Sequence, residues 1–313
     1  MLQHSHPTRS ARIGLLQISA AGVLWGTGGL AVQVIRQHAP MSVLTISAYR
    51  MLIAALVLLA TLAALRQLRG VTVLLRTHPG HTVLVGASTA TYQALYFGAV
   101  VSAGVSVATV VSLGLAPLLL TVGDTVRHRR LPHPGDLAVL VVALTGLVLV
   151  STSAGAAGSG PHPGLGIAAA AGSGAAYALT TVLGRPLAQV TGPLTLTTAT
   201  TSIGALTLAP LGLAAGLAGG SLGTRDPAAL GTLLYLGLLT MALAYGLLYA
   251  GLRTAPARAA VIATLLEPVT AAVVAAAFLD ERLGAPGWVG TGLVLAAVAG
   301  LARRTPAPAV PPG

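Results

Sequence analysis

Ten long apolar segments fill almost the whole chain, and each is long enough to cross a lipid bilayer as a helix. Inside a bilayer every backbone polar group needs a partner within the protein, which favours helices. A membrane β-barrel would show alternating segments of about ten residues, whereas these runs are continuous. The sequence therefore predicts an all-α polytopic membrane protein with ten transmembrane helices. We place them at about residues 13–35, 43–65, 81–100, 104–125, 136–151, 164–183, 194–216, 228–250, 257–278 and 287–302.

The composition excludes several other classes of protein. Of 313 residues, 55% are hydrophobic and 7% are charged, whereas a soluble domain carries roughly 25% charged residues. The net charge of +11 comes from arginines that lie mostly in short clusters between apolar segments, so we expect no nucleic-acid partner. Cysteine is absent and the histidines fall in or near loops and tails, so we expect neither a metal site nor a cofactor. The apolar segments carry no paired acids, Ser–His pair or HExxH-type site, and no phosphate-binding glycine-rich loop occurs. We therefore expect neither an enzyme nor a carrier driven directly by ATP.

Segments six to ten repeat segments one to five with an offset of 150 to 152 residues. Because each copy has an odd number of crossings, the two five-helix repeats must take opposite orientations in the membrane. We expect the repeats at residues 13–155 and 164–304, after an N-terminal tail at 1–12 and before a disordered tail at 305–313. The matching positions include Gly14 with Gly166, Gly22 with Gly174, Trp25 with Tyr177, Leu44-Thr45 with Leu194-Thr195, and Leu115-Ala116-Pro117 with Leu266-Glu267-Pro268.

The arginines predict the orientation of the chain. With the N-terminus in the cytoplasm, 13 arginines fall on the cytoplasmic side and 3 on the other side, as the positive-inside rule requires. We therefore expect a multi-pass protein of the plasma membrane with both termini in the cytoplasm. The cytoplasmic arginine clusters also favour anionic lipid headgroups as partners. The oligomeric state stays open, with a homodimer as one option.

Two charged residues lie within the hydrocarbon region, where a charge is costly unless it has a use or a partner. Glu267 lies about ten residues into the ninth segment, close to the midplane, and Arg50 about seven residues into the second. We interpret Glu267 as a carboxylate for proton coupling or for binding a substrate amine; the alternative is a protonated structural carboxyl. Arg50 would anchor a substrate carboxylate or switch with Glu267; the alternative is an arginine that extends toward the membrane surface or holds a helix carbonyl.

Aromatic and polar residues inside the segments are further candidates for a cavity wall. Tyr92 and Tyr96 share one face of the third segment, and Tyr245 and Tyr249 share one face of the eighth, because residues four apart stack on a helix. A buried Tyr or Trp needs a polar partner, which a wet cavity supplies; simple packing is the alternative. The candidates for substrate binding are Trp25, Arg50, Tyr92, Gln93, Tyr96, Tyr177 and Glu267.

Two prolines occupy equivalent positions in the two copies. Pro117 lies in the fourth segment and Pro268 in the ninth, and each removes a backbone hydrogen bond near the middle of the membrane. We treat both as candidate hinges, since helix interruptions in carriers serve as hinges or expose polar backbone to a cavity. A static kink is the alternative.

Four short motifs occur in order along the chain: Leu24-Trp25-Gly26, Tyr49-Arg50, Leu265-Leu266-Glu267-Pro268, and the hairpin Phe278-Leu279-Asp280-Glu281-Arg282-Leu283. On these motifs the chain resembles the drug/metabolite transporter superfamily, in its ten-helix EamA-like branch, from about residue 13 to residue 304. One departure is Arg129, which stands in the first copy where Glu281 stands in the second. The resemblance implies a carrier of small polar solutes that favours export.

The leading hypothesis is a secondary transporter that exports small polar metabolites, such as amino acids or amines, by alternating access around a midplane site. Proton coupling through Glu267 and uncoupled facilitated diffusion both stay open. One alternative is proton-coupled efflux of lipophilic cationic drugs, which the lack of an acid in residues 13–35 disfavours. A second alternative is a non-transporting membrane scaffold, which leaves the inverted repeat and Glu267 unexplained.

Overall fold

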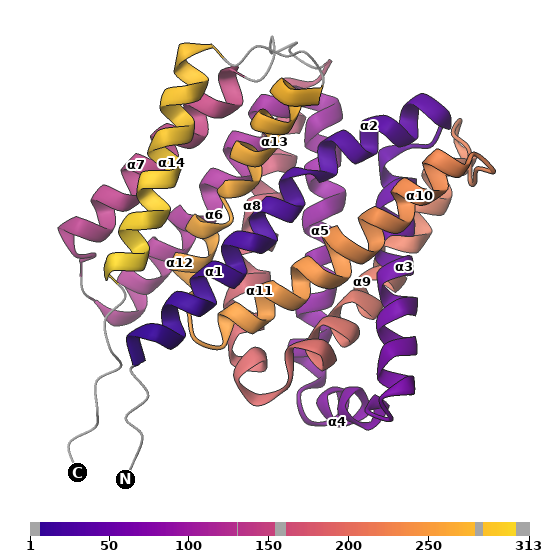
Figure 1. Cartoon of the computed structure of the whole chain (residues 1–313), viewed down its shortest axis with the longest axis horizontal. Helices are drawn as coiled ribbons and strands as arrows, with labels where there is room; N and C mark the ends of the chain where they lie inside the picture. Colours follow the sequence, from indigo (N-terminus) through magenta and orange to yellow (C-terminus); the bar gives the residue numbers. More distant parts are fainter. Residues whose placement is uncertain (1–6, 130, 154–160, 279–283, 305–313) are drawn as a thin grey trace.

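The computed structural model describes residues 7–129, 131–153, 161–278 and 284–304, and within these ranges the chain forms helices and no strand. The expected C-terminal tail at 305–313, the first part of the N-terminal tail, and residues 279–283 of the hairpin motif lie outside the described residues. The helices pack into one bundle, in which α1 (Pro7–Gly26) begins and α14 (Ala285–Arg304) ends on the same side (Figure 1). We call this side the terminal side, and the opposite side the far side.

The remaining helices follow in chain order. The first half of the chain continues with α2 (Gly28–His38), α3 (Val43–Ala64), α4 (Leu68–Thr77), α5 (Pro79–Ala103), α6 (Val105–His128) and α7 (Pro134–Ser153). The second half contains α8 (Pro163–Val190), α9 (Pro193–Leu217), α10 (Pro227–Tyr235), the π-helix η1 (Leu236–Leu243), α11 (Ala244–Leu252), α12 (Ala257–Ala263) and α13 (Leu266–Phe278) before α14.

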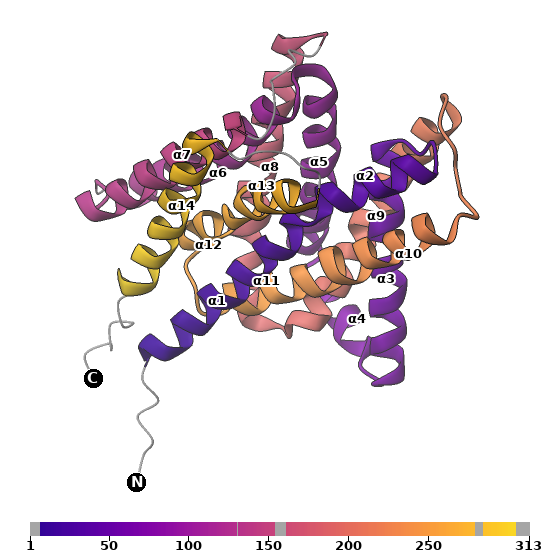
Figure 2. The ribbon, with the colours of Figure 1, turned by 45° about the horizontal axis from the view of Figure 1, so that its top comes forward.

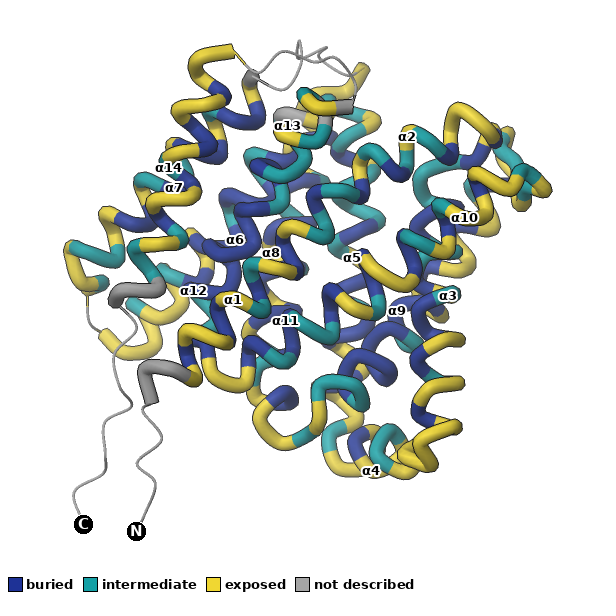
Figure 3. The backbone as a smooth tube through the Cα atoms, viewed as in Figure 1, coloured by how far each residue is buried: buried dark blue, intermediate teal, exposed yellow. Residues whose placement is uncertain are grey.

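The described helices account for all ten expected membrane segments. Eight of them are long and apolar enough to span a membrane by length and composition. The tenth, α14, contributes a shorter apolar stretch, and the third, α5, is 25 residues long but carries several Thr, Ser, Tyr and Gln residues. Many large apolar side chains are exposed, and exposed residues recur along many helices of the bundle (Figure 3), which suits a lipid environment. The chain is therefore an all-α polytopic membrane protein.

Three of the ten spans are interrupted, which the sequence did not predict. The first span divides into α1 and α2 at Thr27, and the ninth divides into α12 and α13 at Thr264 and Leu265. The eighth span stays helical throughout, but its α-helix is interrupted by η1, which replaces α-helical turns between α10 and α11. Irregular backbone within a membrane is tolerated where it is buried in protein or lines a cavity. All three interruptions therefore direct attention to the interior of the bundle.

The two prolines expected as hinges occupy different settings. Pro117 lies inside the continuous helix α6, whereas Pro268 is the third residue of α13. A proline in the first turn of a helix removes an N–H that has no helical partner there, so Pro268 does not free a carbonyl as we expected. The interruption comes earlier, where the N–H groups of Leu265 and Glu267 bond to carbonyls three residues back at 3.1 and 2.9 Å.

The segment between the second and third spans is not a simple loop but contains α4. This helix lies on the terminal side of the bundle (Figure 1). Leu74 of α4 is buried against the bundle, whereas Arg69, Val73 and Arg76 are exposed. An amphipathic helix with basic residues suits the boundary between lipid tails and headgroups.

Glycine contacts show the inverted relation between the two repeats. Gly14 lies near the start of α1, on the terminal side, where a Cβ would come 2.8 Å from the Gly251 carbonyl oxygen. The matching Gly166 lies near the start of α8, and a Cβ there would come 2.7 Å from the Ala103 nitrogen. Figure 2 shows that α8 begins on the far side, beside the end of α5. The same close approach is thus repeated with the opposite orientation.

Candidate functional site

A small cavity lies where the two repeats meet, in the interior of the bundle. Its volume is about 40 Å³, which is room for roughly three water molecules. Each repeat contributes three side chains from three different helices, and the wall therefore depends on the packing of both repeats. The lining residues are Trp25 of α1, Arg50 of α3 and Tyr92 of α5, together with Tyr177 of α8, Tyr245 of α11 and Glu267 of α13.

Five of these six residues were substrate-binding candidates from the sequence; the sixth, Tyr245, was noted only for the helix face that it shares with Tyr249. Tyr245 and Tyr249 are four residues apart, as Tyr92 and Tyr96 are, and this shared spacing was the signal for it. The remaining candidates, Gln93 and Tyr96, are not part of the cavity wall. Tyr96 lies behind Tyr92, with its hydroxyl 2.9 Å from Thr109 Oγ1.

The four aromatic rings form two pairs, and each pair joins the two repeats. The ring centroids of Trp25 and Tyr245 are 5.1 Å apart, and those of Tyr92 and Tyr177 are 5.2 Å apart. Both separations lie in the range of favourable aromatic contacts. Trp25 matches Tyr177 in the repeat, and Tyr92 and Tyr245 lie on corresponding spans, the third and the eighth. Each ring pair is therefore the counterpart of the other. The cavity therefore lies on the pseudo-twofold axis of the protein.

The interruptions of the first and eighth spans hold Trp25 in place. Its indole Nε1 donates a hydrogen bond of 2.8 Å to the carbonyl of Thr240 in η1. One turn away, the hydroxyls of Thr27 and Tyr235 are 2.7 Å apart. Since a π-helix is a rare form that occurs mostly as short insertions at functional sites, we take η1 to be part of the site.

The interruption of the ninth span places Glu267 in the first turn of α13. A helix N-terminus carries a partial positive charge and stabilises an anionic side chain there. Just before it, Thr264 Oγ1 lies 2.7 Å from the Tyr177 hydroxyl, which ties the break to α8. The Glu267 carboxylate itself makes no hydrogen bond to any described residue, and it faces the cavity.

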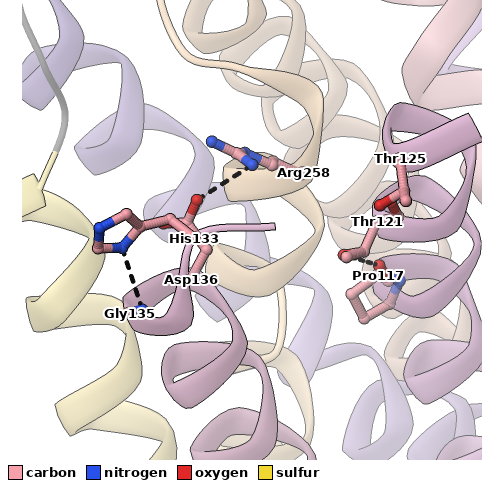
Figure 4. Close-up of polar contacts among 7 residues, drawn as sticks. All are labelled: Pro117, Thr121, Thr125, His133, Gly135, Asp136 and Arg258. Carbon is pink, nitrogen blue, oxygen red and sulfur yellow. Dashed lines mark hydrogen bonds and ion pairs between the residues drawn. The ribbon is translucent and has the colours of Figure 1, made fainter. Parts of the chain in front are cut away.

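Arg50 faces the same cavity from α3. Its Nη2 donates a hydrogen bond of 2.5 Å to Gln93 Oε1, while its Nε is buried without a hydrogen-bond partner. Arg50 and Glu267 thus line the same cavity. They do not form an ion pair with each other. Among the described residues, the ion pair with an N–O distance within 4.0 Å joins Arg258 and Asp136 (Figure 4).

The cavity thus offers one basic side chain, one acidic side chain and four aromatic faces. In the part of the chain that the structure describes, no three His, Asp or Glu side chains lie close enough to hold a metal ion. The chemistry available is therefore the binding of charged and polar groups through Arg50 and Glu267, and of cationic or apolar groups on the rings.

Comparisons with known proteins agree with this architecture. The sequence profile described as the EamA-like transporter family matches the chain twice, at residues 12–152 and 164–303. The uncharacterized transporter YwfM of Bacillus subtilis is 29% identical over 283 residues, which cover 90% of each chain. A protein of known crystal structure has the same fold, with a TM-score of 0.74 and 22% identity over 93% of this chain and 98% of that one. With two profile matches that together span most of its length, this chain belongs to the EamA-like transporter family.

Proposed function

We propose that this protein is a secondary transporter that exports small polar metabolites, such as amino acids or amines, by alternating access around the central cavity. One observation carries the proposal. The cavity lies on the pseudo-twofold axis between the repeats, and its wall contains an arginine and a glutamate that do not pair with each other. Inverted-repeat carriers place their substrate site at this position. Membership of a transporter family supports the class of activity.

The charges of the cavity favour a particular kind of solute. Arg50 and an ionised Glu267 would carry opposite charges on the cavity wall, so a solute with both a carboxylate and an ammonium group would leave the filled cavity balanced. Its carboxylate would lie at Arg50 and its ammonium group at Glu267, beside rings that attract cations. A lipophilic cation without a carboxylate would leave Arg50 buried and unpaired, which is costly. This disfavours the drug-efflux alternative.

The cavity must widen before it admits such a solute, because its present volume is about 40 Å³ and pockets for small molecules are roughly 300 to 1,000 Å³. The interrupted spans are the natural places for that change. We infer hinges at Thr27, at η1, and at the Thr264–Leu265 break, with Pro268 fixing the start of α13. Pro117 lies in a continuous helix and acts in this scheme as a static kink.

For the membrane setting, we propose that the terminal side faces the cytoplasm and that the protein lies in the plasma membrane. The arginine excess on that side supports this orientation. The arginines of α4 would contact anionic lipid headgroups there. A homodimer is one option for the assembly, and counting photobleaching steps of labelled protein in lipid would decide it.

Counterflow into liposomes that contain the purified protein is the test of this function. Labelled amino acids, amines and sugars would be offered with and without a pH gradient, and protein-free liposomes are the control. Saturable exchange of an amino acid or amine is expected, and acceleration by the gradient would support coupling through Glu267. Exchange that does not respond to the gradient indicates facilitated diffusion. If no member of the panel exchanges, this function is wrong.

A further inference from the structure

Gln93 lies directly behind Arg50 and outside the cavity. Its side chain is 2% exposed, and its Oε1 accepts the 2.5 Å hydrogen bond from Arg50 Nη2. Its Nε2 lies 3.5 Å from Met51 Sδ, on the next residue of α3. Gln93 follows Tyr92 on α5, and consecutive helical residues point about 100° apart. Tyr92 therefore faces the cavity while Gln93 faces α3.

The chemical nature of this partner is informative. A buried guanidinium is normally compensated by a carboxylate, which provides both hydrogen bonds and the opposite charge. Gln93 provides one hydrogen bond and no charge, and the Nε of Arg50 has no hydrogen-bond partner. The amide therefore fixes the direction of the guanidinium and leaves its positive charge available to the cavity.

We propose that Gln93 is a positioning residue, which holds Arg50 toward the carboxylate of the transported solute and keeps Arg50 selective for that group. This inference rests on the proposed function, because it requires a solute that carries a carboxylate. An acid at position 93 would form an ion pair with the Arg50 guanidinium and so remove its affinity for the solute carboxylate. An apolar residue of similar length would leave the charge of Arg50 unchanged but would no longer fix the direction of its guanidinium.

The two tryptophans of the chain allow a direct binding assay. Trp25 lines the cavity, whereas Trp288 is 60% exposed on α14 and lies outside the cavity wall. In a Trp288→Phe background, Trp25 is the sole tryptophan, and its fluorescence reports on occupancy of the cavity. The probes are L-alanine, L-valine and L-phenylalanine, each with its carboxamide and its deaminated acid. The carboxamides lack the carboxylate, and the deaminated acids lack the ammonium group.

In this assay we expect Gln93→Glu to weaken binding of the amino acids and the deaminated acids about tenfold or more, while binding of the carboxamides changes by less than about twofold. Gln93→Met, the size-matched control without an acceptor or a charge, should weaken carboxylate binding by a smaller factor. In an Arg50→Gln background, Gln93→Glu should have no further effect on carboxylate binding, since the group that it acts through is gone.

Three outcomes contradict the inference, and they are separable. If Gln93→Glu weakens the carboxamides as much as the amino acids, the residue is structural. If the amino acids bind to Gln93→Glu with unchanged affinity, Gln93 has no positioning role, although the proposed function stands. If none of the nine probes changes the Trp25 fluorescence of the parent protein, the proposed class of solute is wrong and the inference fails with it. Thermal unfolding of each variant verifies that it is folded.

Discussion

The fourth and ninth spans occupy equivalent positions in the two repeats but differ in shape. Both carry a proline at the same place, Pro117 in α6 and Pro268 in α13. The fourth span runs through its proline as one helix, and Thr121 Oγ1 donates a 2.8 Å hydrogen bond to the Pro117 carbonyl (Figure 4). The ninth span breaks before its proline. The proline is therefore not sufficient to break the helix.

Each of the two spans also packs against a glycine of the other repeat. Gly22 of α1 lies against Thr264 in the ninth span, and the matching Gly174 of α8 lies against Ser112 in the fourth. Among the residues that differ, the one before each proline differs in charge: it is Glu267 in the ninth span and alanine in the fourth. A helix break just before a buried carboxylate places that carboxylate at the N-terminus of the following half-helix, where the partial positive charge stabilises it. We therefore attribute the broken shape to the charge that the ninth span carries.

The largest expected effect comes from removing that charge. Glu267→Gln should abolish the response of transport to an imposed pH gradient and lower the rate at least about tenfold, because the titrating group of the cavity is lost. Counterflow in liposomes with and without the gradient measures both. Asp124→Asn, at an exposed acid on α6, is the control and should behave as the parent. A full gradient response in Glu267→Gln would exclude this residue from coupling.

The paired glycines offer a stability test of the two spans. A Cβ at Gly174 would lie 2.5 Å from the Ser112 carbonyl oxygen, whereas a Cβ at Gly22 would lie 3.2 Å from Thr264 Cα. Gly174→Ala should therefore destabilise the protein by about 1–3 kcal/mol, and Gly22→Ala by clearly less. Thermal unfolding of the two variants in the same detergent compares them. Equal losses of stability would mean that the broken ninth span accommodates the added methyl group no better than the continuous fourth span.

The two prolines should respond with opposite signs. Pro117→Ala restores an N–H inside α6, where an interior proline costs roughly 3 kcal/mol in an isolated helix, so we expect a higher unfolding temperature. Pro268→Ala adds an N–H that the first turn of α13 cannot use, and frees the unfolded chain, so a loss of about 0.4–1 kcal/mol is expected. If Pro268→Ala also stabilises the protein, Pro268 does not favour the start of α13, and this explanation of its position is wrong.

The smallest effect is expected for the ion pair that ties α12 to the first repeat. Arg258 Nη1 lies 3.2 Å from Asp136 Oδ2 at the start of α7, and the two side chains are 42% and 35% exposed. A partly exposed pair contributes about 0–1 kcal/mol and weakens in salt. Asp136→Asn should thus lower stability slightly at low salt and not measurably at high salt. A salt-independent loss would assign the effect to the cap of α7 instead.

Much of this arrangement followed from the sequence, because buried charges and spans have strong signals. The apolar segments and their repeat gave the ten spans. The structure brings Trp25, Arg50, Tyr92, Tyr177 and Glu267 to one cavity wall, although their part in binding stays a prediction. Their agreement has a simple cause, since a charge or a polar ring in a membrane helix is driven toward the interior.

The interruption of the first span did not follow from the sequence because a tertiary contact produces it. A Cβ at Gly26 would lie 2.5 Å from the Glu267 carbonyl oxygen, so the end of α1 is set by the approach of α13. Gln93 was expected at the cavity because it lies between Tyr92 and Tyr96 in the sequence. Its true direction depends on Arg50, a residue of another helix. Local patterns contain neither piece of information.

The π-helical η1 has a mechanical consequence. Its hydrogen bonds reach one residue further than those of an α-helix, so the eighth span stores a surplus residue between α10 and α11. If that residue moved along the helix, the turns between its old and new positions would rotate by about 100° and shift by about 1.5 Å. Tyr245 follows η1 by two residues, and Trp25 is bonded to η1 itself. A rotation of this kind would separate the rings of Trp25 and Tyr245 while both ends of the span keep their places. The eighth span would then change the cavity by turning locally, without tilting as a whole.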